Sequence, residues 1–321
     1  MGNKRWAILL VFLFIFSIFS PNHLGAETQS NPYEDNIKKG LAFFNIIQND
    51  DGGFPWYVGD EVGESDHITS AWVIMALGAN GEDLTAKKWV KNGSNPLDYL
   101  VGNTDKLEST TDYARQLLAL SVVEGYEKEK NTIVDKLRAG QDKTGHFGQT
   151  ALDEGEFINA HMWAILALKC AGEEIPNLDG AKKWLLNAQN TDGGFAWYLG
   201  LPSDADDTAI AIQALVALGE PPAESMAIKR ALRYLKSLQG VDGGFSSGWV
   251  NLANASTDSW VWQALKAAGE KQDSPNWVKE GQKVADHLLS LQSDEGCFYW
   301  TAGESRPSVI DTAYALMALS N

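Results

Sequence analysis

A short sequence pattern recurs five times along the chain: a glutamine, three residues, a glycine, one residue and a phenylalanine. Successive glutamines lie 93, 48, 50 and 53 residues apart, so the first interval is about double the others. We therefore expect a degenerate sixth copy in that interval, with Asn103 at the glutamine position. A repeat of this length indicates one repetitive domain, not several unrelated ones. The five glutamines are Gln48, Gln141, Gln189, Gln239 and Gln292.

Each repeat contains two helical segments of different character. Residues 228–238 place apolar side chains on one face and basic side chains on the other, which is typical of a helix with one exposed face. Residues 208–218 are apolar on nearly all sides, which predicts a buried helix. Six such pairs predict an all-α fold: a single α6/α6 toroid of six helical hairpins over residues 37–321, with the buried helices inside.

Residues 1–26 have the pattern of a secretory signal peptide. Two basic residues precede an apolar run over residues 6–19, and residues 24–26 end in small side chains suited to cleavage. The apolar run is shorter than the roughly 20 residues of a membrane-spanning helix, so we expect no integral span after cleavage. Residues 27–36 are expected to be a short linker. These features predict a secreted or cell-envelope-associated protein.

The charge of the chain excludes one class of partner. It carries 42 acidic and 26 basic residues, a net charge of −16. Nucleic-acid binding depends on clustered lysine and arginine, so we expect no nucleic-acid partner. The chain also lacks a glycine-rich phosphate-binding loop, and we expect no cofactor.

The repeats, followed by helices that begin Asp-Thr-Ala, resemble those of the squalene–hopene cyclase and prenyltransferase superfamily of α/α toroids. Within them, residues 203–209 read Ser-Asp-Ala-Asp-Asp-Thr-Ala. This string resembles the Asp-x-Asp-Asp-Thr-Ala motif of class II terpene cyclases, in which the central aspartic acid protonates an alkene or epoxide. The resemblance implies Asp206 as the catalytic acid and Asp204 and Asp207 as its partners, in an isomerase- or lyase-type reaction on an isoprenoid.

The chemistry of that reaction is consistent with these residue types. An acid that protonates a double bond must itself still be protonated, and clustered or buried carboxylates raise one another's pKa. The carbocation that forms needs stabilisation by aromatic faces, because a nucleophile would trap it. We expect His161 to line the same cavity, where it could orient an aspartate. The aromatic candidates near the starts of the inner helices are Trp72, Tyr113, Trp163, Trp260 and Tyr314.

A structural role for the acids is an open alternative. Aspartates recur near the predicted starts of the buried helices, where an acid can cap the helix and meet the positive end of its dipole. In that interpretation Asp207 is one helix cap among several, and only Asp204 and Asp206 are unusual. The recurring aspartates are Asp66, Asp112, Asp207, Asp258 and Asp311.

Other functions remain open. The resemblance to protein prenyltransferases implies a zinc site at positions that are Ser256, Asp258 and Asp311 here, and this set lacks the thiolate and imidazole that zinc prefers. We therefore expect no metal. A non-catalytic toroid could bind a small ligand, as cobalamin carriers do, or a cell-envelope partner. A toroid with two suitably placed carboxylates could instead process glycans. Hydrocarbon cyclases of this superfamily contain a second helical domain, so a partner protein could complete the cavity around a hydrophobic small molecule.

Overall fold

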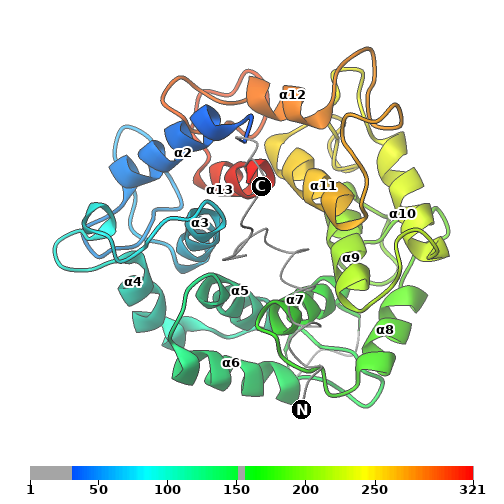
Figure 1. Cartoon of the computed structure of the whole chain (residues 1–321). Coiled ribbons are helices and arrows are strands. Elements are labelled where there is room, and N and C mark those ends of the chain that lie inside the picture. Colours follow the sequence, from blue (N-terminus) through cyan, green and yellow to red (C-terminus); the bar gives the residue numbers. More distant parts are fainter. Residues whose placement is uncertain (1–30, 151–155, 321) are drawn as a thin grey trace, which may run out of the picture.

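The computed structural model describes residues 31–150 and 156–320, and in them twelve α-helices alternate between an outer and an inner ring (Figure 1). The outer helices are α2 (Glu34–Ile47), α4 (Pro96–Gly102), α6 (Glu127–Ala139), α8 (Leu178–Asn187), α10 (Met226–Ser237) and α12 (Val284–Ser290). The inner helices are α3 (His67–Ala79), α5 (Thr110–Ser121), α7 (Ile158–Cys170), α9 (Ala205–Ala217), α11 (Ala255–Ala267) and α13 (Val309–Leu319). Two short 3-10 helices, η1 (Lys87–Trp89) and η2 (Thr104–Lys106), flank α4. The predicted all-α toroid is confirmed.

The toroid begins slightly earlier than expected. Helix α2 starts at Glu34, inside the predicted linker of residues 27–36. The predicted signal peptide, residues 1–26, lies outside the described residues. In the part of the chain that the structure describes, the helices are too short or too polar to cross a membrane.

The inner ring is closed. Each inner helix packs against its two neighbours in chain order, and the last, α13, packs against the first, α3 (Figure 1). The inner helices are buried over most of their surface because alanine and branched apolar residues cover them on all sides; α9 and α3 are the clearest cases. The outer helices bury only one stripe, as in α10, where Ile228, Ala231 and Leu235 face inward.

The repeated glutamine joins each hairpin to the next. Its side-chain amide donates to the carbonyl oxygen of the glycine four residues later and to a carbonyl oxygen that precedes or begins the next outer helix. We call this pair of hydrogen bonds the glutamine bridge. The second acceptors, with N···O distances, are Trp89 for Gln48 (2.9 Å), Asn177 for Gln141 (3.2 Å), Ala227 for Gln189 (2.9 Å), Trp277 for Gln239 (2.8 Å) and Asn36 for Gln292 (2.9 Å).

The glycine of the motif is required for two reasons. Gly145 and Gly296 both have a φ of +96°, in the left-handed region that residues with a Cβ rarely adopt. A Cβ on Gly145 would also lie 2.3 Å from the backbone nitrogen of Ala181, and one on Gly296 would lie 2.2 Å from the carbonyl oxygen of Lys39. The backbone of one hairpin therefore touches the backbone of the next where only glycine fits.

The phenylalanine of the motif is fully buried, and its backbone N–H is bonded to the fourth residue of the following inner helix. That fourth residue supplies a hydroxyl, an imidazole or a carboxylate as the acceptor. The acceptors, with distances, are Ser70 for Phe54 (2.8 Å), His161 for Phe147 (3.1 Å), Thr208 for Phe195 (2.8 Å), Asp258 for Phe245 (2.7 Å) and Thr312 for Phe298 (2.8 Å). The fourth residue of an inner helix therefore points away from the toroid axis and toward its own turn.

The degenerate sixth copy has no glutamine bridge. Asn103, at the predicted glutamine position, instead donates its amide to the carbonyl oxygen of Tyr99 within α4, at 2.7 Å. Its side chain is one methylene shorter than glutamine, and η2 replaces the glycine turn.

Candidate functional site

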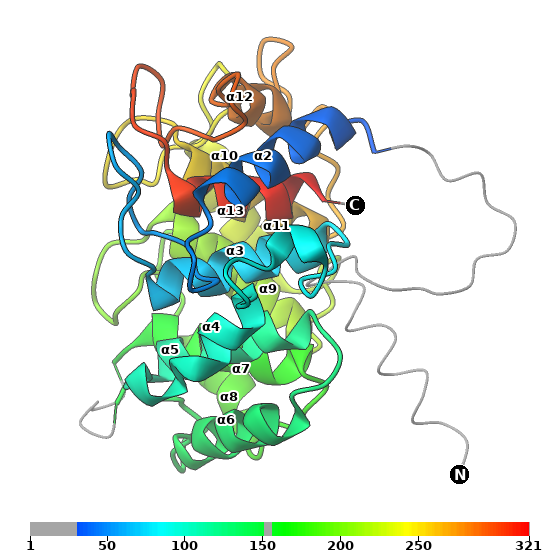
Figure 2. The ribbon, with the colours of Figure 1, turned by 90° about the vertical axis from the view of Figure 1, so that its left-hand side faces the viewer.

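The starts of the inner helices meet at one end of the toroid, which we call the helix-start end. The amide of Asn159 in α7 donates to the Asp207 carboxylate in α9 at 2.7 Å, and the Ser256 hydroxyl in α11 donates to the Asp311 carboxylate in α13. Each of these residues is the second or third of its helix. The loops that lead into α3 and α13 project from the same end, on the left of Figure 2.

Three acids gather at the start of α9. Asp204 is the N-cap: its backbone is extended, and its carboxylate accepts from the backbone N–H of Asp207 at 2.8 Å. Asp204 is 3% exposed and Asp207 is 8% exposed. Burial raises the pKa of both carboxyl groups, and the charge of Asp204 raises that of Asp207 further. These two acids are therefore tied to the helix start and to each other.

Asp206 differs from its two neighbours. One of its carboxylate oxygens, Oδ1, is buried and has no hydrogen-bond partner. Burial raises the pKa of Asp206 to about 7, although the nearby Thr257 hydroxyl lowers it in part. The charges of Asp204 and Asp311 add to the rise. A carboxyl group with this pKa is protonated in a large share of molecules at neutral pH and has a free oxygen for an incoming group.

Aromatic rings occupy the axis below these acids. The sixth residues of the inner helices form one level, which we call the axial layer: Trp72, Arg115, Trp163, Ile210, Trp260 and Tyr314. Trp72 of α3 contacts Trp163 at 5.4 Å, Trp260 at 5.6 Å and Tyr314 at 5.1 Å between ring centroids. Because α3 is not adjacent to α7 or α11 in the ring, the contacts of Trp72 with Trp163 and Trp260 cross the toroid axis.

Asp206 lies one helical turn before the axial layer. It precedes Ile210 by four residues, so both side chains lie on the same face of α9. The charges of Asp206 and Asp311 are close enough to Tyr314 to raise the pKa of its hydroxyl, an effect that adds to burial. The site therefore combines a protonated carboxyl group with a floor of aromatic rings.

Arg115 is a member of the axial layer that the sequence analysis missed. Its guanidinium lies over the Trp72 ring, 5.7 Å from the centroid, and forms an ion pair with Asp112 at 3.2 Å. Its Nε atom is buried and has no hydrogen-bond partner. Aligning the degenerate repeat with the others would have placed Arg115 in register with the axial tryptophans.

Two predicted cavity residues lie elsewhere. His161 and Tyr113 are fourth residues of their helices, so they face the turns and not the axis. His161 is fully buried between α7 and α8: Nδ1 accepts from Phe147, and Nε2 therefore carries the hydrogen that it donates to the carbonyl oxygen of Ala181 at 3.1 Å. Burial lowers the pKa of His161 to about 3, so it is neutral. The expectation that His161 lines the cavity or orients a catalytic aspartate is corrected. The Tyr113 hydroxyl donates to the Leu107 carbonyl oxygen at 3.2 Å.

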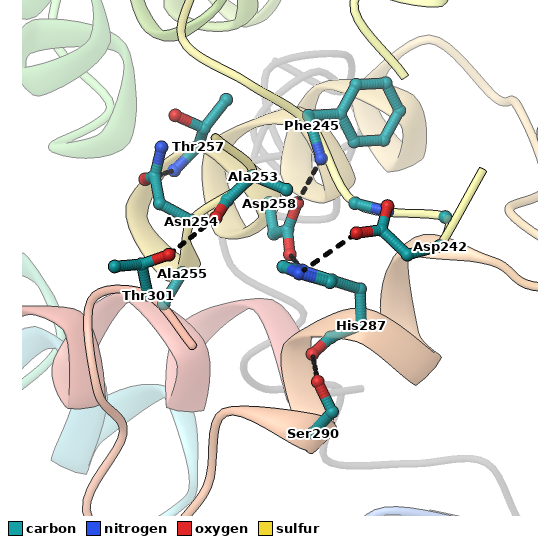
Figure 3. A network of polar contacts seen from close by, with 12 residues as sticks. Asp242, Phe245, Ala253, Asn254, Ala255, Thr257, Asp258, His287, Ser290 and Thr301 are labelled. Carbon is teal, nitrogen blue, oxygen red and sulfur yellow. Dashed lines mark hydrogen bonds and ion pairs between the residues drawn. The ribbon is translucent and has the colours of Figure 1, made fainter. Parts of the chain in front are cut away.

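Asp258 is also not the helix cap that the sequence analysis expected. It is the fourth residue of α11, and it points outward to α12 (Figure 3). One carboxylate oxygen accepts from the Phe245 N–H, and the other lies 2.5 Å from His287 Nδ1. The second imidazole nitrogen faces Asp242 at 3.7 Å. Burial raises the pKa of Asp258 to about 6 in spite of the His287 partner. This pair joins the fifth hairpin to the sixth.

Of the other recurring acids, Asp66 and Asp112 do cap their helices, whereas Asp207 and Asp311 are third residues of helices capped by Asp204 and Ser308. Asp66 accepts from the Thr69 N–H at 2.7 Å, and Asp112 forms a capping box with Ser109. In the part of the chain that the structure describes, no group of three or more histidine, cysteine or acidic side chains is placed to hold a metal ion. Asp258 in particular points away from Ser256 and Asp311, because Asp258 bonds His287 while Ser256 bonds Asp311.

Comparison with solved structures shows the same fold in terpene cyclases. The type II terpene cyclase MstE from Scytonema superposes with a TM-score of 0.62 at 13% identity, over 90% of this chain and 97% of that chain. The ent-copalyl diphosphate synthase from Streptomyces platensis gives 0.57 at 20% identity, over 79% and 50%. A glycosidase in complex with glucose gives 0.59 at 12% identity, over 92% and 98%. At these identities the likeness is one of fold.

Sequence comparison gives the family. Drimenyl diphosphate synthase from Streptomyces showdoensis is 28% identical over 44% of this chain and 26% of that protein. Squalene–hopene cyclase from Bradyrhizobium diazoefficiens is 28% identical over 44% of this chain and 25% of that protein. The match to these relatives thus spans about a quarter of their length. The model of the prenyltransferase alpha-alpha toroid domain matches residues 9–321. The chain therefore belongs to the prenyltransferase alpha-alpha toroid domain family.

Proposed function

We propose that this toroid is a terpenoid cyclase that starts its reaction by protonating a carbon–carbon double bond, with Asp206 as the acid. The observation that carries the proposal is the Asp206 carboxyl group: its pKa is about 7, its Oδ1 is unpartnered, and it lies one turn above four aromatic rings. Asp204 supports it, because its charge opposes the ionisation of Asp206. The charge of Asp206 likewise raises the pKa of Asp207.

The reaction is a redistribution of bonds without oxidation or reduction. The proton of the Asp206 carboxyl group goes to one carbon of the terminal alkene, and the π electron pair forms the new C–H bond. The neighbouring carbon becomes a cation, which the π pair of the next alkene attacks to close a C–C bond. A final carbon loses a proton to water, so the cyclic product is an isomer of the substrate. Solvent then returns a proton to Asp206 for the next turnover.

The axial layer supplies what the cation needs. The faces of Trp72, Trp163, Trp260 and Tyr314 can stabilise positive charge by cation–π attraction of about 1–2 kcal/mol each when desolvated. The indole rings offer no lone pair of comparable nucleophilicity to a carboxylate, so the cation survives until the chain has cyclised. Trp163 and Tyr314 are half-buried, so part of each ring is open to contact by a substrate.

A single toroid is compatible with this reaction. The solved chain of the type II terpene cyclase MstE is matched over 97% of its length. MstE has also been solved with its substrate, geranylgeranyl dihydroxybenzoate. This supports a reaction that one toroid can carry out.

The pattern of residues 1–26 supports a location outside the cytoplasm, as a secreted or cell-envelope protein. In that location the substrate would be an isoprenoid lipid of the envelope or of the medium. A hydrophobic chain reaching the helix-start end would meet Asp206 with its terminal alkene and the axial layer with the rest of its length.

A second candidate function is ligand binding without catalysis. Tryptophans in the loops that lead into α3, α9 and α11 are strongly exposed: Trp56 by 66%, Trp197 by 42% and Trp249 by 56%. Exposed aromatic side chains are suited to holding a ligand. This candidate predicts binding that is unaffected by Asp206→Asn and no change in the ligand.

The experiment is a turnover assay. Purified protein is incubated with linear isoprenoids of increasing length, as hydrocarbons, alcohols and diphosphates, and the extracts are analysed by gas chromatography and mass spectrometry. We expect cyclic isomers with the wild type, none with Asp206→Asn, and unchanged amounts with Asp135→Asn, a control acid exposed on α6. A ligand recovered unchanged from both wild type and Asp206→Asn would favour the binding candidate.

A further inference from the structure

The helix-start end has few donors left for an anionic group. Helix N-termini bind phosphates through unpaired backbone N–H groups, but here these groups are already bonded. The first N–H groups of four inner helices donate to carbonyl oxygens of the next loop: Thr110 to Gln149 (2.9 Å), Ile158 to Trp197 (2.9 Å), Ala205 to Ser247 (2.8 Å) and Ala255 to Trp300 (2.8 Å). The third N–H groups of five inner helices are bonded to side chains of their N-caps: Asp66, Ser109, Asp204, Asn254 and Ser308.

The charges at this end also disfavour an anion. Asp112, Asp206 and Asp311 surround the axial layer, and burial raises the pKa of Asp206 and Asp311. A negatively charged substrate group placed nearby would be disfavoured in the same way, by loss of hydration and by repulsion from these acids. His67, at the start of α3, does not add a positive charge, since burial lowers its pKa and the charge of Arg115 lowers it further.

Arg115 is the cation of the axial layer, and its charge is already paired with Asp112 at 3.2 Å. Its side chain is 16% exposed, and its buried Nε–H has no acceptor. A buried donor without a partner costs free energy until an acceptor arrives. The Asp112 carboxylate already balances the guanidinium charge, so Arg115 adds little attraction for a group with several negative charges. Its buried Nε–H still lacks an acceptor, and a single uncharged oxygen can supply one.

Building on the proposed function, we infer that the substrate of this toroid is an isoprenoid with an uncharged oxygen terminus, such as a hydroxyl or carbonyl, and that Arg115 selects it by donating its Nε–H to that oxygen. This sets the chain apart from the relative named drimenyl diphosphate synthase, to which it is similar over 44% of its length. Arg115 is here a specificity-determining residue and takes no part in the proton transfer.

The experiment measures binding, so that it does not depend on turnover. The Asp206→Asn protein is dialysed to equilibrium with radiolabelled farnesol, farnesyl diphosphate or farnesene, with and without Mg²⁺. We expect farnesol to bind at least about tenfold more tightly than farnesyl diphosphate in both conditions. Equal or tighter binding of the diphosphate, or no binding of any of the three probes, would overturn the inference.

A second variant isolates the role of Arg115. Arg115→Lys, added to Asp206→Asn, keeps the charge that pairs with Asp112 but lacks the Nε–H. We expect it to weaken farnesol binding by about three- to tenfold, the value of one hydrogen bond, and to leave farnesene binding unchanged. An equal loss for both probes would mean that Arg115 only supports the fold. If farnesol binds as expected and the wild type still forms no cyclic product, the cyclase proposal fails while this inference stands.

Discussion

The side-chain amide of Gln292 donates to the carbonyl oxygen of Asn36 at 2.9 Å, and Asn36 donates its own amide to the Gln292 oxygen at 2.6 Å. These residues are 256 positions apart, in the last and first hairpins. The glutamine bridge that joins successive hairpins thus also joins the two ends of the toroid.

A closed ring makes a prediction about two glutamines. Gln292→Leu and Gln189→Leu each remove one glutamine bridge, and each should lower the free energy of unfolding by about 1–3 kcal/mol, since buried carbonyl oxygens lose their donors. Urea unfolding followed by circular dichroism measures both. An open superhelix would instead make Gln292→Leu nearly neutral while Gln189→Leu stays costly.

The motif glycine should be far less tolerant than other glycines of similar backbone conformation. Gly145 and Gly172 have φ values of +96° and +74°, but only at Gly145 would a Cβ meet neighbouring backbone. We expect Gly172→Ala to cost about 1 kcal/mol from backbone strain alone. Gly145→Ala should cost about 3 kcal/mol or more, because two backbone segments must separate. Equal losses in the two variants would show that contact between hairpins contributes nothing at this position.

The raised pKa of Asp206 predicts how stability changes with pH. A folded-state pKa of about 7, against 3.8 for an unperturbed aspartate, means that the folded protein holds the proton more tightly than the unfolded chain. The contribution of Asp206 to the free energy of unfolding is therefore fully present below about pH 4 and is lost as the pH rises through 7. Asn cannot ionise, so Asp206→Asn should be roughly 2–4 kcal/mol more stable than wild type at pH 8 and close to it at pH 4.

Unfolding curves from pH 4 to pH 8 test this expectation. Asp204→Asn is a useful comparison, since it keeps an N-cap oxygen while removing a buried charge. If Asp206 served only as a favourable charge at the helix start, Asp206→Asn would be less stable than wild type at pH 8. That result would remove the physical basis for its role as an acid.

The axial layer should matter for the chemical step more than for the fold. Trp260 contacts Trp72, Trp163 and Tyr314, with centroid distances of 5.6, 5.5 and 4.6 Å. Trp260→Leu removes a cation–π partner, and we expect about a tenfold or greater fall in kcat. Trp260→Phe keeps a ring and should recover much of the rate. Comparable rates for the Leu and Phe variants would mean that the ring is only packing.

The fold was predictable because each residue type of the repeated motif has a specific structural role in every hairpin that carries it. Glutamine bridges two carbonyl groups, glycine allows two backbones to touch, and phenylalanine fills the space between the rings. Since these contacts recur in nearly every hairpin, the same residue types recur at nearly even spacing in the sequence. The toroid could be predicted from that spacing. Among the described residues, the repeat that contains Asn103 is the one copy without a glutamine bridge.

The site was only partly predictable from the sequence, because the direction in which a helical side chain points depends on the residue at which its helix begins. Trp72, Trp163, Trp260 and Tyr314 are sixth residues and meet on the axis. His161 and Tyr113 are fourth residues, and a shift of two positions turns a side chain by about 200°, to the opposite face. Asp258 differs from Asp207 and Asp311 by one position, or about 100°, which is enough to turn it toward α12. Helix boundaries read from sequence are rarely accurate to one residue.

Deuterium incorporation tests the central claim most directly. The reaction is run in D₂O with an unlabelled linear isoprenoid, and the cyclic product is analysed by mass spectrometry. If the Asp206 carboxyl group starts the reaction, the product gains one deuterium on the less substituted carbon of the former terminal alkene, and Asp206→Asn yields no product. A cyclic product without deuterium, or a labelled product that persists in Asp206→Asn, would contradict the account.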